Sequence, residues 1–166
     1  MRDIWWKAAS IRDQATLLTL MEEYYAVDGI PFDLTTATRA LEILLKDPNL
    51  GEVVLVCKKD TIIGYIALTN GYSLEFGGAY QFIDEFFIRE QFRRKGAGAA
   101  TLQFVEQLAK DSNVSMLHLE VEQHNTEAHS FYSKLGFKSQ GRHLLVKPIP
   151  PNASDINESA QSSARG

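Results

Sequence analysis

A short segment rich in basic residues and glycine, residues 90–101 (EQFRRKGAGAAT), has the composition of an anion-binding loop. Three consecutive cations at 93–95 precede Gly96 and Gly98, and small residues then lead into a helical pattern. The first turn of a helix has unpaired N–H groups and the positive end of the helix dipole. A phosphate there would accept hydrogen bonds from those groups and be attracted by the dipole. The segment therefore predicts a phosphate-binding turn, with a solvated basic turn as the competing interpretation.

Two common phosphate-binding motifs do not fit this segment. The third glycine of a dinucleotide fingerprint is replaced by Thr101, which is too large for close helix–strand packing. A polar stretch, 89–95, also separates the preceding strand from the glycines. A Walker A motif would require Gly-Lys-Ser/Thr, which does not follow. A dinucleotide-binding oxidoreductase is thus a remote alternative.

Carboxylates that could act as bases lie on both sides of the loop. Asp84 and Glu85 interrupt an aromatic strand pattern at 81–88, and Glu120 ends a later one. A carboxylate in an apolar strand is costly unless it is exposed or used. Adjacent strand residues point to opposite faces unless a bulge intervenes. A surface or capping role is the competing interpretation of each.

The elements that must position these residues alternate between strand and helix patterns. They are predicted as a strand at 4–9, a helix from Ser10 or Asp13, a helix at 36–46, a hairpin of strands 52–59 and 62–70 turning at Asp60-Thr61, a loop at 71–80, a strand at 81–88, a helix through 102–109, a strand at 115–121, a short helix at 125–136, and one or two strands within 137–146. This order indicates an α/β or mixed α+β architecture.

Composition limits the possible functions. A chain of 166 residues with 45% hydrophobic residues fits one globular domain, and we assign residues 1–147 to it. Residues 148–166 hold almost no large apolar residues and are predicted to be a disordered tail. A net charge of −4 argues against nucleic-acid or anionic membrane partners. The single cysteine, Cys57, permits no intrachain disulfide, no metal-ligand spacing appears, and a cytoplasmic protein is expected.

The segments IDEFFIREQF, RRKGAG and NTEAHSFYSKLGF follow one another in the chain. In this order they resemble the fourth strand with the turn leading from it, the Arg/Gln-x-x-Gly-x-Gly/Ala signature and the second motif of the GNAT superfamily of acyl-CoA N-acyltransferases. The resemblance covers about residues 1–146 and is clearest from Tyr80 onward. It implies a GNAT-type fold, with a central twisted mixed sheet of six to seven strands flanked by about four helices.

The resemblance also implies a coenzyme A site. The pyrophosphate would bind the loop amides and the pantetheine arm would lie along the fourth strand, near an asparagine and a tyrosine of the second motif. The matching positions are Phe86, Phe87, Ile88, Arg93, Arg94, Lys95, Gly96, Ala97, Gly98, Ala99, Asn125 and Tyr132.

The catalytic candidates are Tyr132 as the acid for the departing thiolate and a carboxylate as the base. Keeping an amine of pKa near 10.4 neutral at pH 7 costs roughly 4–5 kcal/mol, which motivates a base or a water relay. Glu85 and Asp84 rank together, ahead of Glu120. A phenol of pKa near 10 transfers its proton to a thiolate with difficulty, so Tyr132 is expected to act mainly as a hydrogen-bond donor. Acceptor-pocket candidates by resemblance are Tyr24, Tyr25, Asp28 and Phe32.

The resulting hypothesis is an N-acetyltransferase that uses acetyl-CoA as co-substrate and needs no metal. Its acceptor would be a small or polyamine-like primary amine or a peptide amine. The alternative is a non-catalytic acyl-CoA-binding or sensing domain on the same fold. Such a domain would need the loop but neither the carboxylates nor Tyr132. A homodimer is plausible from family habit alone.

Overall fold

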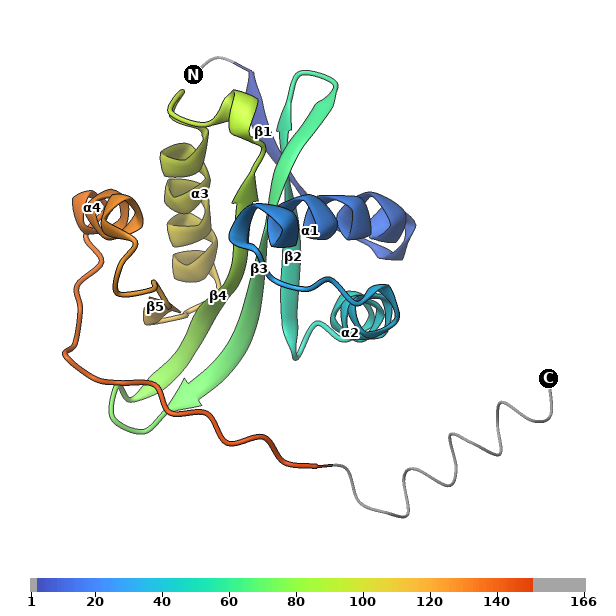
Figure 1. Cartoon of the computed structure of the whole chain (residues 1–166). Helices are drawn as coiled ribbons and strands as arrows, with labels where there is room; N and C mark the ends of the chain where they lie inside the picture. Colours follow the sequence, from blue (N-terminus) through green and yellow to red (C-terminus); the bar gives the residue numbers. More distant parts are fainter. Residues whose placement is uncertain (1–2, 151–166) are drawn as a thin grey trace. The chain divides into compact units, whose positions relative to one another are not determined.

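The computed structural model describes residues 3–150, which fall into two units, residues 3–135 and 136–150, each described by itself. The first unit holds the regular structure (Figure 1), which consists of β1 (Ile4–Ala8), α1 (Gln14–Asp28), α2 (Leu34–Lys46), β2 (Gly51–Lys58), β3 (Thr61–Ser73), β4 (Gly78–Ile88), α3 (Ala97–Asp111), β5 (Met116–Leu119) and α4 (Thr126–Lys134), with short 3-10 turns at Ile11–Asp13 and Glu90–Phe92. Within residues 3–150, no helix combines the length and apolar character needed to cross a bilayer.

The five strands form one sheet in the order β1-β2-β3-β4-β5. The first four strands are antiparallel to their neighbours, and β5 runs parallel to β4. Helices α1 and α2 cover one face, and α3 and α4 lie on the other (Figure 1). The main core lies under α1 and α2, where Leu17, Leu20, Leu55 and Tyr65 are almost fully buried.

The mixed α+β class is confirmed, but the sheet has five strands in the described chain and not six to seven. The strands expected within 137–146 are absent, and that prediction was wrong. Gly136 and Gly141 adopt left-handed conformations (φ 92° and 66°), which interrupt an extended chain, and residues 138–146 are exposed. Most of the predicted tail, 151–166, lies outside the described residues.

The loop expected at 71–80 was also wrong, because β3 and β4 continue through most of it and pair as far as Ser73 with Gly78. Gly71 lies opposite Tyr80, and a Cβ at Gly71 would come within 2.3 Å of the Tyr80 ring. The glycine therefore makes room for an aromatic ring across the strands and does not end a strand.

Two irregularities of β4 create the site. Opposite β3, Ala67 pairs with Glu85 and Leu68 pairs with Ile83, so Asp84 is an extra residue in a β-bulge. On the other edge, pairing with β5 stops at Ile83, whereas pairing with β3 continues to Ile88. Beyond the bulge, the edge of β4 at residues 84–88 thus has no strand partner within the described chain.

Candidate active site

The bulge brings both strand carboxylates to one cavity. Asp84 and Glu85 line a cavity of about 570 Å³ between α1, α2 and strands β2–β4. In a regular strand, these neighbours would point to opposite faces. The sequence analysis required a β-bulge for Asp84 and Glu85 to point the same way, and the structure contains one. Both carboxylates predicted as bases therefore line the same cavity.

Glu85 is held by two phenols. Its Oε1 accepts a hydrogen bond from Tyr25 Oη at 2.7 Å, and its Oε2 accepts one from Tyr65 Oη at 2.6 Å. Burial raises the pKa of Glu85, the two phenols lower it, and the nearby charge of Asp84 raises it again, leaving the pKa above its usual value. Burial, and after it the charge and hydrogen bonding of Glu85, raise the pKa values of Tyr25 and Tyr65, so both stay neutral donors.

Asp84 is more open than Glu85. It remains exposed to solvent at the cavity, yet the protein around it removes enough hydration to raise its pKa. No other cause contributes to that shift. A carboxylate with a raised pKa that solvent can reach is well suited to accept and release a proton near neutral pH.

Tyr24 packs beside Phe87 of β4. Its ring lies 5.8 Å from the Phe87 ring, and burial raises its pKa, with further contributions from Asp28, Glu85 and Tyr132. Tyr24 is therefore within electrostatic reach of both Glu85 and Tyr132.

Burial raises the pKa of Tyr132 to about 12. Transfer of its proton to a thiolate of pKa near 8.5 is then uphill by about 5 kcal/mol, so hydrogen-bond donation is favoured over full transfer.

An ion pair that sequence analysis missed fixes α1 against the end of β4. Arg89 donates from Nε and Nη2 to the two carboxylate oxygens of Glu23, each at 2.7 Å, and from Nη1 to the Ile62 carbonyl oxygen at 2.9 Å. This bidentate geometry is the strongest form of such a pair. Because Tyr24 and Tyr25 follow Glu23 directly, the pair positions their helix over the carboxylates.

The basic loop forms the predicted turn before α3. Arg94 and Gly96 are left-handed (φ 57° and 85°), and only the glycine adopts that conformation without strain. The first hydrogen bond of the helix runs from the Ala100 N–H to the Gly96 carbonyl oxygen. The N–H groups of residues 97–99 precede it and have no partner within the helix. An anion could accept from them.

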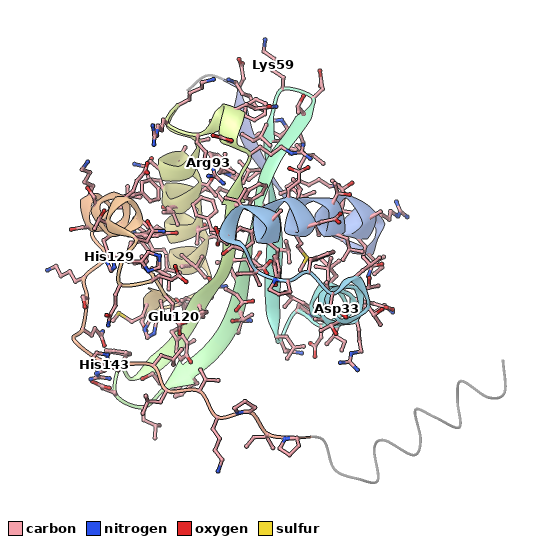
Figure 2. All side chains as sticks on the ribbon, viewed as in Figure 1. Asp33, Lys59, Arg93, Glu120, His129 and His143 are labelled. Carbon is pink, nitrogen blue, oxygen red and sulfur yellow. The ribbon has the colours of Figure 1, made fainter. Side chains whose placement is uncertain are left out.

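The three basic side chains of the loop make contacts within the protein. Arg93 donates from Nε to the Ile88 carbonyl oxygen at 2.6 Å, and its guanidinium lies over the Phe87 ring. Lys95 donates to the Gln91 carbonyl oxygen at 2.8 Å. Arg94 makes an exposed pair with Glu127 at 3.1 Å. Arg93 thus fastens the loop to the end of β4, close to the start of α3 (Figure 2).

Helix α4 packs against the start of α3 at Gly98. A Cβ at Gly98 would lie 3.2 Å from Phe131 Cζ and 3.8 Å from Phe86 Cζ. This glycine therefore permits close packing of two aromatic rings, a role that the sequence did not reveal. Asn125 begins α4, and its Oδ1 accepts a hydrogen bond from the Ala128 N–H at 3.0 Å. The cap uses only the oxygen of that side chain.

The predicted residues are only partly brought together. Tyr25, Phe32, Asp84 and Glu85 line the cavity, whereas Tyr24 and Asp28 do not. Glu120 is exposed and does not line the cavity; Figure 2 shows it at the β5 edge of the sheet, away from Asp33, which does line the cavity. Tyr65 was missed, although a tyrosine within an apolar run signals a buried phenol that needs a partner.

Comparisons with known proteins give the same fold and a family. The family model described as "Acetyltransferase (GNAT) family" matches residues 14–137. An integron cassette protein from the mobile metagenome of Cole Harbour Salt Marsh is 38% identical, with a TM-score of 0.78 over 89% of this chain and 91% of that one. A predicted acetyltransferase from Clostridium acetobutylicum, solved with acetyl-CoA, is 18% identical, with a TM-score of 0.73 over 87% and 96% of the two chains.

A curated relative supports an enzyme. The peptidyl-lysine N-acetyltransferase YjaB of Salmonella typhimurium is 32% identical over 131 residues, which cover 75% of this chain and 80% of that protein. Together with the family model, this relative favours catalysis over the non-catalytic alternative. The chain belongs to the GNAT family of acetyltransferases.

Proposed function

We propose that this enzyme transfers an acetyl group from acetyl-CoA to a primary amine by direct attack of the amine on the thioester. The observation that carries the proposal is the pair of carboxylates, Asp84 and Glu85, at a cavity next to the point where β4 loses its β5 partner. The relative YjaB acts on peptidyl-lysine, which is also a primary amine.

The residues present fit acetyl-CoA. The edge of β4 at 84–88 offers main-chain groups to an extended amide-containing arm, as an added strand would use them. The N–H groups of residues 97–99 begin α3 and suit a pyrophosphate. When bound, acetyl-CoA supplies the acetyl group and a thiolate leaving group. Asn125 and Tyr132 lie on α4, which packs against the start of α3.

Proton movement is assigned to the cavity side chains. Asp84 accepts the proton of the amine, because it is solvent-accessible and its raised pKa makes it a stronger base than an ordinary carboxylate. Glu85, whose two oxygens accept hydrogen bonds from Tyr25 and Tyr65, holds negative charge beside the amine. Tyr132 donates a hydrogen bond to the sulfur as negative charge develops there.

The proposal is tested in two stages. At 100 times its dissociation constant, acetyl-CoA should add about 2.7 kcal/mol of stability, which raises the Tm by roughly 5–10 °C. Release of free thiol from acetyl-CoA is then followed against alkylamines, polyamines, aminoglycosides and lysine peptides. No Tm shift with acetyl-CoA, or a shift with no thiol release for any amine, would refute the proposal.

A further inference from the structure

The cavity beside the carboxylates is mostly apolar. Twelve of its twenty lining residues have aliphatic or other apolar side chains, and two more are tyrosines. Its volume of about 570 Å³ is within the range of small-molecule sites, which combine apolar walls with a few polar groups. Much of the wall comes from α2, which contributes Ala37, Ala40, Leu41, Ile43 and Leu44.

The charge of the cavity has one sign. Among its lining residues within the described chain, Asp33, Asp84 and Glu85 are acidic, and none is Lys, Arg or His. Asp33 serves α2, since its Oδ1 accepts a hydrogen bond from the Thr36 N–H at 2.6 Å at the start of that helix. Asp33 is thereby engaged at the start of α2, whereas Asp84 and Glu85 are adjacent carboxylates on β4 that cap no helix, which favours a cation at their end of the cavity.

The other end would penalise a second charge. Phe32 stacks edge-to-face on Tyr25 at 5.5 Å beside Glu85, and apart from Thr36 at its start the α2 wall offers alanine, leucine and isoleucine. A second ammonium or a set of hydroxyls against this aliphatic part of the wall would lose hydration and find no polar partner there, and such burial is costly. An apolar body would instead gain from burial there.

Resting on the proposed function, we infer that the acceptor is a primary amine with one ammonium group on an apolar alkyl or aryl body. The ammonium faces Asp84 and Glu85, and the body lies along α2. This narrows the acceptor class, because polyamines, aminoglycosides and polar peptides present further polar groups to the same wall.

The closest chemical test compares hexylamine with 1,6-diaminohexane, which differ by one terminal ammonium. We expect kcat/KM for hexylamine to exceed that for the diamine at least tenfold, and 2-phenylethylamine to be accepted as well. Calorimetric titration of each amine into the enzyme with coenzyme A gives a readout independent of turnover, and hexylamine should bind more tightly. Spermidine, kanamycin and a lysine peptide complete the panel.

A variant checks where the body of the amine lies. Ala40 lines the cavity from the exposed side of α2, so Ala40→Asp places a carboxylate on the apolar wall without removing core packing. We expect it to narrow or reverse the preference for hexylamine over the diamine. Ala15→Asp is the matched control, since Ala15 is exposed on α1 and does not line the cavity, and it should leave the preference unchanged.

The outcomes separate the two proposals. If acetyl-CoA raises the Tm and thiol is released, but the diamine, spermidine, kanamycin or the peptide is preferred, the acceptor class is wrong and the acetyltransferase proposal stands. An unchanged preference in Ala40→Asp also overturns the inferred orientation. If acetyl-CoA does not bind or no amine releases thiol, the proposed function itself fails.

Discussion

The phenol of Tyr65 should stabilise the ionised form of Glu85, and Tyr65→Phe tests this. Tyr65 is only 1% exposed, and it donates at 2.6 Å to Glu85 Oε2. Phenylalanine keeps the ring and its packing against Phe87, so the change removes little besides the hydroxyl. Because the Tyr65 side chain is buried, water cannot easily replace the lost donor.

The size of the effect follows from the charge of the acceptor. A hydrogen bond to a charged group contributes about 1.5–3 kcal/mol, whereas one between neutral groups contributes about 1 kcal/mol. For a chain of this length, the variant should therefore lower the Tm at pH 8 by roughly 3–12 °C. The phenol lowers the pKa of Glu85, so its extra stabilisation is present above that pKa and lost as the pH falls through it.

Thermal melts at pH 8 and pH 4.5 provide the assay. The Tm gap between wild type and Tyr65→Phe should be larger at pH 8, and the acid limb of the kcat/KM profile should move to higher pH if Glu85 must be ionised. Tyr25→Phe is the control, because its phenol is only partly buried and should cost less. Equal gaps at both pH values, or a larger cost for Tyr25→Phe, would refute the reasoning.

Three further predictions concern the rest of the site. Tyr132→Phe should lower turnover at least tenfold in the thiol-release assay while calorimetry finds acetyl-CoA affinity nearly unchanged. Asp84→Asn should lower turnover at least a hundredfold and raise the Tm at pH 8, because a raised pKa means that ionised Asp84 destabilises the fold; melts at pH 4 should lose that gain. Gly98→Val should push Phe131 away and cost about 1–3 kcal/mol, seen as a lower Tm, with Gly98→Ala milder.

The helices and the central hairpin could be predicted because their signals are local. Apolar spacing and start signals placed α2, α3 and α4 to within a few residues. The prediction of strands at 137–146 was wrong because a strand depends on a distant part of the chain. A β-rich composition there needs a partner strand, and composition alone does not supply one.

The site was predicted by residue type but not by geometry. Asp84 and Glu85 were conspicuous as charges in an aromatic strand, yet their convergence depends on a bulge set by pairing with β3. Tyr65 and Arg89 escaped notice because their partners, Glu85 and Glu23, are 20 and 66 residues away in the chain. Local patterns carry no information on such distant contacts.

The early end of β5 has a consequence for how the chain tolerates substitution. The open edge of β4 at 84–88 consists of main-chain N–H and carbonyl groups, which every residue type except proline carries in full. Replacing Phe86 would reshape the surroundings but leave its hydrogen-bonding groups in place, whereas proline there would delete a donor. The ability of this edge to bind an extended ligand through main-chain hydrogen bonds thus depends on where β5 ends. Side chains along this edge can change with little loss of that ability.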